Sequence, residues 1–567
     1  MSLEADYLIV GGGSAGCVLA NRLSASSKNR VILIEAGRDT PPDRPEEAIL
    51  DSYPRIAYFD PRNTWADLRV HLEPVPHNAP ERAGPARRYE QARLMGGGSS
   101  LNDMQANRGT PDDYAEWVAM GARDWSWEHV LESYRRIERD LDFDGPMHGK
   151  SGALPIRRIG KDVWPGFTKA AAVAFAAAGY PELHDQNGEF GDGYFPVAIS
   201  NIYDRRVSSA TAFLDNATRR RPNLTILADT ELKGLVVDGA RVVGGDVLHK
   251  GSVRRITARE TIVCAGGIHS PAILLRAGIG PAAQLRSRGV AVVADRPGVG
   301  ANLMEHPTIS ISCHIAPEAR LPKSLRRHIH LALRWTSSVK DCAPQDMYMV
   351  TVTKTGWHPV GECIGSLMTW VNKPFSRGRV TLAEKPAAEP RVEFELLSDK
   401  RDVDRLKEGM RLIAGLYEKP SLRAVARDPF PTSYSERLRD LGVVSTKNLI
   451  ATSILAKLLD GPASLRKTLI EKLVVEGDTL EALMGSDDLL EQFVRTKAHG
   501  VWHASGTCRM GDADDRDAVT TSSGKVIGVE GLRVVDASIM PTIPRANTNL
   551  PTIMIGDRIS DLILAEA

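Results

Sequence analysis

The chain opens with two short apolar runs separated by a helical pattern. Residues 7–10 (YLIV) and 31–34 (VILI) are continuous apolar stretches, which are typical of strands buried on both faces of a parallel sheet. Between these runs, Val18, Leu19 and Leu23 recur at helical spacing. The order of strand, helix and strand predicts a βαβ unit at the start of an α/β domain.

A glycine-rich turn, residues 11–16 (GGGSAG), joins the first apolar run to this helix. Gly11 permits the tight turn, Gly13 lets the backbone approach a pyrophosphate, and Gly16 lets the helix pack closely on the strand. The helix N-terminus then offers free N–H groups to the phosphates. Glu35, which ends the second run, is placed to accept hydrogen bonds from an adenosine ribose. The whole pattern predicts a dinucleotide site, and this stretch alone leaves FAD and NAD open.

Length and composition limit the class of protein further. A chain of 567 residues is too long for one ordinary domain, so we expect two intertwined domains. Its 72 Lys and Arg residues nearly balance 71 Asp and Glu residues, which gives no support for a nucleic-acid partner. We find no apolar run long enough to span a bilayer. The first residues carry Glu4 and Asp6 just before the first strand, so we expect no secretory signal.

The cysteines are scattered and include no CxxC pair, which argues against a metal site and against a disulfide framework. A reduced, cytoplasmic location is therefore expected. The six are Cys17, Cys264, Cys313, Cys342, Cys363 and Cys508.

Further motifs follow along the chain in a fixed order. They are residues 93–102 (RLMGGGSSLN), 260–281 (ETIVCAGGIHSPAILLRAGIGP), 501–511 (VWHASGTCRMG), 534–542 (VVDASIMPT) and 547–552 (NTNLPT). Together with the N-terminal turn, they resemble the glucose-methanol-choline (GMC) oxidoreductase family over essentially the whole chain. Within the family, residues 184–187 (HDQN) and 192–196 (DGYFP) resemble members that oxidise furanic and aryl alcohols.

The resemblance implies an α/β fold in which a Rossmann-like FAD-binding domain carries a substrate-binding cap on an antiparallel sheet. Each of the two domains is then assembled from separate pieces of the chain. The expected pieces of the FAD-binding domain are 1–155, 226–305 and 490–567, and those of the cap are 156–225 and 306–489.

The resemblance also indicates which residues carry out the chemistry. In alcohol oxidation a base takes the hydroxyl proton while a hydride leaves the carbinol carbon for flavin N5. Among the 14 histidines, His503 lies where the family places its base, and Asn547 lies at the second catalytic position. Asn547 would donate a hydrogen bond to the developing alkoxide, although a helix N-cap is its simpler interpretation. Val501 and Trp502 are expected to wall the substrate pocket, and His306 to hold a domain crossover.

Further residues carry over from the family as contacts of the cofactor. Glu35 is expected to bind the adenosine ribose, Leu232 the adenine through its backbone, and Gly97 and Asn102 the isoalloxazine. The full set is Gly11, Gly13, Ser14, Ala15, Gly16, Glu35, Ala36, Trp65, Arg93, Gly97, Asn102, Met104, Leu232, Ala265, Asp536, Ala537, Thr548 and Asn549.

At the C-terminal end of this set, Asp536 is expected to face the pyrophosphate. Thr548 and Asn549 should present N–H groups at a helix N-terminus and stabilise the anionic reduced flavin. Two departures from the family matter. Leu101 stands where some relatives tether FAD through a His, which predicts non-covalent FAD, and Gly266-Gly267 replaces the usual Gly-Ala.

The basic stretch 323–330 (KSLRRHIH) is most simply the solvated face of a helix. The alternative is a cap segment that meets an anionic substrate.

The sequence thus predicts an FAD-dependent oxidase of small primary alcohols, aryl or furanic, such as hydroxymethylfurfural. The product would be the aldehyde, and the acid where an aldehyde hydrate is oxidised in turn, with O2 as the electron acceptor. Three alternatives stay open: a dehydrogenase with another acceptor, an FAD-containing hydroxynitrile lyase, and a non-catalytic FAD-binding protein. A light-driven decarboxylase would need a fatty-acid tunnel, for which the sequence gives no sign.

Overall fold

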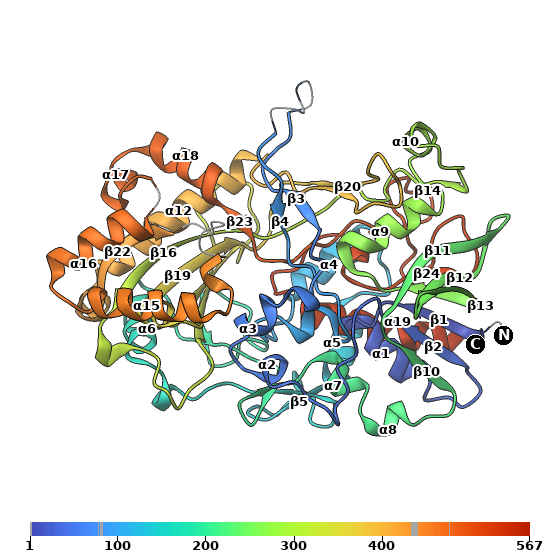
Figure 1. The fold of residues 1–567 in the computed structure, drawn as a ribbon, viewed down its shortest axis with the longest axis horizontal. Coiled ribbons are helices and arrows are strands. Elements are labelled where there is room, and N and C mark those ends of the chain that lie inside the picture. Colours follow the sequence, from blue (N-terminus) through green and yellow to red (C-terminus); the bar gives the residue numbers. More distant parts are fainter. Residues whose placement is uncertain (1–2, 77–78, 80–82, 433–439, 476, 567) are drawn as a thin grey trace.

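The protein contains two large sheets that lie beside each other along the long axis of the molecule (Figure 1). The computed structural model describes residues 3–76, 79, 83–432, 440–475 and 477–566. Within these residues, no helix combines the length and the apolar character that crossing a bilayer requires.

The predicted βαβ unit lies at the centre of the first sheet, which we call the dinucleotide sheet. In order across the sheet its strands are β10 (Leu224–Leu227), β2 (Val31–Ile34), β1 (Leu3–Val10), β13 (Ser252–Val263), β12 (Arg241–His249) and β11 (Thr230–Asp238), with β24 (Leu532–Val534) paired to β13. The strands from β10 to β13 and β24 are parallel, whereas β12 pairs antiparallel with β13 and β11 pairs antiparallel with β12.

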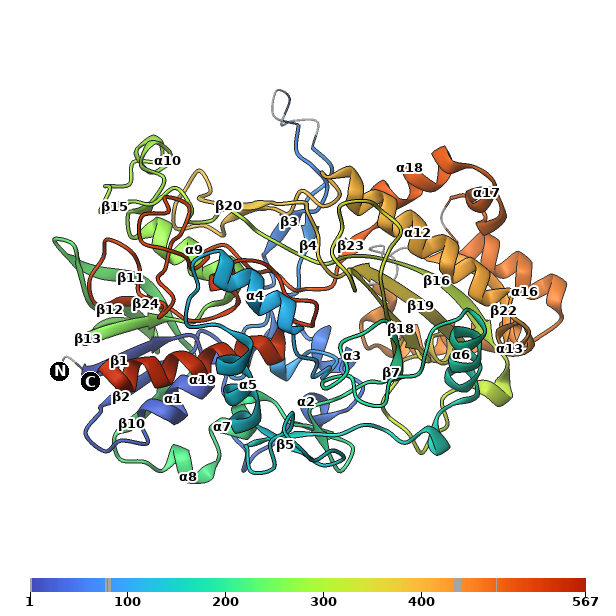
Figure 2. The ribbon, with the colours of Figure 1, turned by 180° about the vertical axis from the view of Figure 1, so that it is seen from behind.

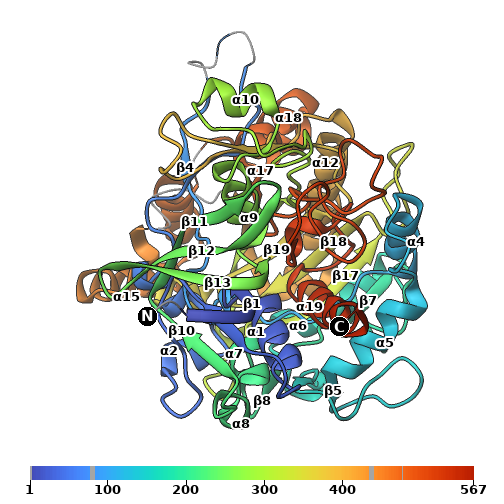
Figure 3. The same cartoon turned by 90° about the vertical axis from the view of Figure 1, so that its right-hand side faces the viewer.

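Helices cover one face of the dinucleotide sheet. Helix α1 (Ser14–Leu23), predicted from its spacing, packs against the last helix of the chain, α19 (Asn549–Glu566). Their crossing is close, because a Cβ added at Gly556 would lie 3.0 Å from the Cα of Ala15. Figure 3 views the molecule from this end, where β1, β13 and β12 lie side by side. The first and last parts of the chain therefore build one layer together.

The second sheet, the cap sheet, is entirely antiparallel. Helix α12 (Lys400–Tyr417) crosses its outer face (Figure 2), where apolar side chains of both elements share the largest core. In order the strands are β22 (Ala426–Thr432), β16 (Pro307–Ile315), β19 (Ile364–Val371), β18 (Met347–Val352), β17 (Ile329–Trp335) and β7 (Gly193–Pro196), with β23 (His499–Gly500) paired to β16.

Two smaller groups of elements complete the arrangement. A four-stranded sheet joins early and late parts of the chain through β20 (Arg379–Thr381), β21 (Arg391–Glu393), β3 (Arg69–His71) and β4 (Arg87–Arg88). At the end of the molecule away from the dinucleotide sheet lie α15 (Thr446–Leu459), α16 (Ala463–Leu469), the π-helix η6 (Ile470–Val474), α17 (Leu480–Gly485) and α18 (Asp487–Lys497) (Figures 1 and 2).

The structure matches the predicted fold class, and the five-piece division of the chain stays a prediction. Two strands do not follow the predicted division. β10 begins at Leu224 yet belongs to the dinucleotide sheet, and β23 lies within the third FAD-binding piece yet pairs with the cap strand β16. Boundaries of this kind depend on strand pairing, which residue composition does not reveal.

The interpretation of residues 323–330 as a solvated helix face is wrong. This stretch is irregular up to β17, which begins at Ile329, and both Arg327 and His328 are fully buried. The carboxylate of Asp103 explains how the charge is accommodated, since it lies 3.4 Å from His328 Nε2 and 3.9 Å from Arg327 Nη1. The guanidinium groups of Arg55 and Arg327 help to hold the pKa of Asp103 down at about 2, against the opposing effect of burial. Burial holds the pKa of His328 well below its ordinary value, so the imidazole adds no charge of its own.

Candidate active site

A cavity of about 800 Å³ is lined by both large sheets. From the dinucleotide sheet it is lined by Val10 and Ile34, which end the two apolar runs of the βαβ unit. From the cap sheet it is lined by Ser310, Ser312 and Met368, on adjacent strands and on one face. This position between the carboxyl ends of parallel strands and a cap is where an α/β fold binds its ligands.

The glycine turn forms one end of the cavity. Its main chain packs too closely on neighbouring main chain for side chains at Gly11 and Gly16. Gly11 has a φ of +108°, and a Cβ added there would lie 2.5 Å from the carbonyl oxygen of Cys264. A Cβ at Gly16 would collide with the carbonyl oxygen of Gly11. At Gly13 the nearest atom would be 3.8 Å away, so this residue leaves open space toward the cavity. The turn therefore has room and free N–H groups for a pyrophosphate.

A second glycine loop packs on the first, as a Cβ at Gly97 would lie 2.8 Å from the Cα of Gly13. Ser14 Oγ donates to Asn549 Oδ1 over 2.8 Å and joins the starts of α1 and α19. Both helix N-termini thus reach the same cavity, where their dipoles favour bound negative charge.

Two buried carboxylates line this end of the cavity. Glu35 accepts hydrogen bonds from the Gly12 and Gly37 N–H groups, at 2.9 and 2.8 Å, and burial raises its pKa. Asp536 accepts from Ser270 Oγ and Gly266 N, at 2.5 and 2.8 Å, and burial raises its pKa as well. A carboxylate has four acceptor sites, so Glu35 keeps capacity for ribose hydroxyls.

The other end of the cavity brings His503 and Asn547 together. The Asn547 Nδ2 atom lies 3.1 Å from His503 Nε2, and the opposite ring nitrogen, His503 Nδ1, lies 2.9 Å from His306 Nδ1. Only 8% of His503 is exposed, and burial lowers its pKa to about 3. The imidazole is therefore neutral at physiological pH, as a proton acceptor must be.

The hydrogen bonds also determine which nitrogen of His503 carries the proton. The amide nitrogen of Asn547 can only donate, so His503 Nε2 must accept and is unprotonated. The proton then lies on Nδ1 and is donated to His306 Nδ1. We expected His306 to hold a domain crossover, and the structure also places it in direct contact with His503.

Glu305 holds the main chain beneath this pair, and sequence reasoning missed it. Its carboxylate accepts from the N–H groups of His503, at 2.8 Å, and His306, at 2.9 Å, and from Tyr89 Oη at 2.8 Å. Burial raises the pKa of Glu305 to about 7. A buried carboxylate needs such donors, and its position next to His306 in residues 302–307 (NLMEHP) was the available signal.

Several aromatic side chains line the cavity, and one of them, Trp502, is next to His503 in the sequence. Trp502 has a φ of +63°, which directs its ring beside that of Tyr58, with centroids 5.5 Å apart and planes at 84°. Val501 also lines the cavity, as expected. The sequence did not reveal the remaining aromatic members, because they come from separate segments without a shared motif: Tyr58, Phe59, Trp357, Trp370 and Phe430.

Of the residues predicted to bind the cofactor, all but three line the cavity. Gly16 lies behind the turn, where its role is the close packing described above. Arg93 lies over the ring of Trp65, with 4.6 Å between its guanidinium carbon and the ring centroid. Met104 is fully buried in the core. Leu101, on which the expectation of untethered FAD rests, also lines the cavity.

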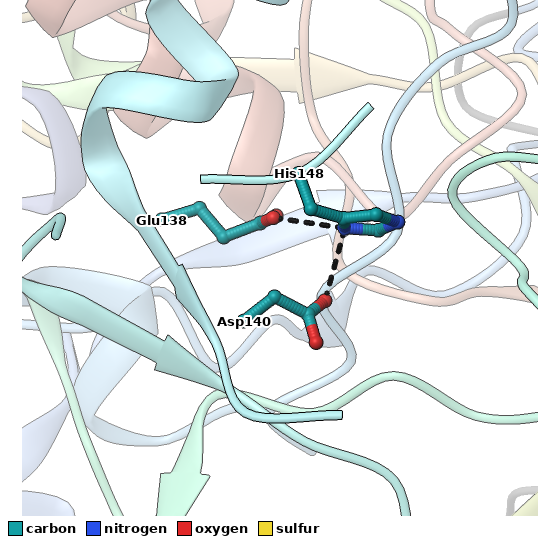
Figure 4. Close-up of side chains that lie close together, drawn as sticks. All are labelled: Glu138, Asp140 and His148. Atoms are coloured by element: carbon teal, nitrogen blue, oxygen red, sulfur yellow. Dashed lines mark hydrogen bonds and ion pairs between the residues drawn. The ribbon is translucent and has the colours of Figure 1, made fainter. Parts of the chain in front are cut away.

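A separate cluster of Glu138, Asp140 and His148 has the residue types of a metal site (Figure 4). His148 Nδ1 lies 3.0 Å from Glu138 Oε1 and 3.1 Å from Asp140 Oδ2. Arg108 and Arg158 already contact these carboxylates, at 2.6 and 2.5 Å. Because both carboxylates already bind guanidinium groups, we interpret the cluster as a buried ion-pair network.

The network includes the motif at residues 184–187, because Asp185 Oδ2 lies 2.8 Å from His148 Nε2 and Asp185 Oδ1 lies 3.2 Å from Arg158. With Asp185, three carboxylates face two guanidinium groups and one imidazole. The three carboxylates raise the pKa of His148 to about 10, against the opposing effect of burial. A protonated His148 makes the network neutral overall.

Comparisons with known proteins show which proteins the chain resembles. Two family models, both described as GMC oxidoreductase, match residues 5–308 and 374–556. A 5-(hydroxymethyl)furfural oxidase of Methylovorus sp. (strain MP688) is 42% identical, over 99% of each chain. An oxygen-dependent choline dehydrogenase of Brucella anthropi is 30% identical, over 99% of this chain and 96% of that protein.

Among solved structures, pyridoxine 4-oxidase from Mesorbium loti superimposes with a TM-score of 0.78 at 26% identity, over 99% of each chain. A fungal aryl-alcohol oxidase shares the fold, with a TM-score of 0.74 at 20% identity over 100% of each chain. The chain therefore belongs to the GMC oxidoreductase family, whose members bind FAD.

Proposed function

We propose that the protein is an FAD-dependent oxidase of primary aryl or furanic alcohols, in which His503 is the base and FAD is held non-covalently. The observation that carries the proposal is the His503–Asn547 pair, which lines the same cavity as the glycine turn and the aromatic side chains.

In the proposed reaction, the unprotonated His503 Nε2 takes the proton of the substrate hydroxyl. The substrate hydroxyl must replace Asn547 Nδ2 as the partner of His503 Nε2, because that nitrogen has a single lone pair. The released amide group then donates to the oxygen on which negative charge develops, and an amide does this without competing for the proton. His306 keeps the other proton of His503 on Nδ1. FAD, when bound, supplies the hydride acceptor. Glu305 and its donors hold both histidine main chains in place throughout.

The substrate class is supported by the walls of the cavity. Flat aromatic and furanic rings are complementary to a site lined by several aromatic side chains. The relative that is 42% identical is a 5-(hydroxymethyl)furfural oxidase, which supports a furanic alcohol here. An aldehyde hydrate presents the same CH–OH group as an alcohol, so the acid is the proposed second product. Leu101 has no nucleophilic atom, which supports untethered FAD. The proposed location is cytoplasmic.

The experiment that tests the reaction is one panel of alcohols scored under two conditions, with O2 and with an artificial electron acceptor. Hydrogen peroxide formation with aryl and furanic alcohols is the expected result. Turnover only with the artificial acceptor would instead identify a dehydrogenase. Failure of the flavin to bleach under anaerobic alcohol would favour a hydroxynitrile lyase.

His503→Ala tests the mechanism. We expect the variant to keep FAD but to lose about 10²-fold or more of the rate of flavin reduction, as is typical for a general base. His184→Ala is the matched control, since 79% of the His184 side chain is exposed. In the wild type, kcat/KM should fall only well below pH 6.5, because burial lowers the pKa of His503 and the base acts unprotonated. A near-normal rate in His503→Ala would place the base elsewhere.

A further inference from the structure

The exposed apolar side chains of the protein are concentrated in one segment. Fifteen large apolar side chains are exposed among the described residues, and eight of them lie between residues 443 and 473. The other seven are scattered singly, which is normal for a protein surface. The eight are Val443, Val444, Leu449, Ile450, Ile454, Leu458, Leu465 and Leu473.

Helix α15 explains this concentration, because it is apolar on both of its sides. On the inner side, Leu459 packs with Ile364 and Phe430 in a small cluster of its own, and Leu455 lines the cavity. The outer side presents Leu449, Ile450, Ile454 and Leu458, which are 42–58% exposed. A surface helix in water has a polar outer side, whereas a helix that is apolar all round is normally covered.

Basic residues are interspersed with these apolar side chains. Lys447, Lys457, Lys467 and Lys472 are all exposed in the same segment. The exposed acidic residues there are fewer: Asp440, Asp460 and Glu471. Asp460 is already bound by Arg320, and Glu471 faces Lys467 at 3.9 Å. The segment therefore presents apolar side chains flanked by lysines, a combination that suits contact with an anionic lipid surface.

We propose that residues 440–475 form a membrane-docking surface, on which α15 and α16 lie against an anionic lipid bilayer. Both helices are at the end of the molecule away from the dinucleotide sheet, so a flat bilayer can reach them (Figures 1 and 2). The attachment is peripheral. The apolar side chains enter the interface, and the lysine side chains extend to the anionic headgroups.

Charge favours a lipid surface over a second copy of the chain. A two-fold contact between copies would bring the same lysine-bearing patch against itself, and like charges in such a contact are unfavourable. An anionic bilayer instead attracts Lys447, Lys457 and Lys472, while Lys467 faces Glu471. Docking would also leave one helix, α15, between the lipid and the cavity, since Asn448, Thr452 and Leu455 line the cavity from that helix.

Co-sedimentation of the holoenzyme with vesicles tests the proposal. We expect binding to vesicles of phosphatidylcholine and phosphatidylglycerol in equal parts, weaker binding to pure phosphatidylcholine, and weaker binding at high salt. The triple substitution Ile450→Gln, Ile454→Gln, Leu458→Gln should reduce the lipid affinity by about tenfold or more, because it removes the apolar contribution. Lys447→Gln with Lys457→Gln should reduce both affinity and salt dependence.

A matched control replaces exposed apolar residues elsewhere, Val173→Gln with Val253→Gln, and should bind vesicles like the wild type. Unchanged FAD absorbance and an unchanged melting temperature would show that the triple variant is folded. If it is not folded, the lysine variant provides a separate test of lipid binding. Absence of binding to the mixed vesicles at low salt overturns the proposal. So does a concentration-dependent dimer, seen by light scattering without lipid, that the triple substitution abolishes.

Discussion

The two ends of the cavity are built by different means. At the glycine end the site is made by main chain, and Gly11 and Gly16 are positions where any side chain would collide with a carbonyl oxygen. At the His503 end it is made by side chains from separate segments of the chain, with Trp502 and Tyr58 as examples. The first end tolerates little change in sequence, while the second can change its lining without altering the fold. Under the proposed function, cofactor binding and substrate choice are thereby separated in one cavity.

The largest effect that this comparison predicts is at Gly16. Gly16→Ala places a methyl group against the Gly11 carbonyl oxygen, so the turn must move away from the position that a pyrophosphate requires. We expect loss of most bound FAD and a decrease in unfolding free energy of about 3 kcal/mol. The ratio of flavin to protein absorbance and a chemical denaturation curve measure the two effects.

Gly415→Ala is the control for this substitution. Gly415 lies within α12, and an added Cβ meets no atom within 4 Å. Alanine should stabilise the helix there by about 0.5–1 kcal/mol. Full FAD content in Gly16→Ala would show that the turn can adapt and would break the proposed contrast between the two ends.

The same contrast explains how much could be learned from the sequence. Strands 7–10 and 31–34 and the turn between them were predictable because burial and backbone geometry restrict residue types there. The pairing of His503 with Asn547 followed from the family resemblance. By contrast, residues 323–330 were misjudged, because the compensating Asp103 is remote in sequence. The aromatic lining depends on tertiary contacts in the same way, and no local pattern reveals it.

A second prediction concerns the buried network at His148, which is connected to the His503 end of the cavity through Arg108 and its neighbour Asn107. Arg108 belongs to the network, and its neighbour Asn107 accepts a hydrogen bond from Asn547 N over 3.2 Å. His148→Gln removes one charge from this network, so we expect a loss of about 3 kcal/mol of unfolding free energy near pH 6.

The pKa of His148 determines how the effect of His148→Gln on the unfolding free energy changes with pH. The carboxylates raise the pKa of His148 in the folded protein to about 10, above the ordinary value of about 6.5. Its contribution to stability is therefore complete below pH 6.5 and is lost as the pH rises toward 10. The difference in stability between wild type and His148→Gln should shrink over that range. A constant difference from pH 6 to 10 would mean that His148 acts through packing alone.

The smallest expected effect is at Trp502, and it bears directly on the independence of the two ends. Trp502→Ala removes an aromatic wall and the hydrogen bond from Trp502 Nε1 to Glu90, which is 3.1 Å long. We expect kcat/KM for an aryl alcohol to fall about tenfold, the effect of a lost apolar contact in a substrate pocket, while FAD content stays unchanged. Trp502→Phe keeps the wall and loses only the N–H donor, so its loss should be smaller. Loss of FAD in Trp502→Ala would show that the His503 end also contributes to cofactor binding. The two ends would then not act independently.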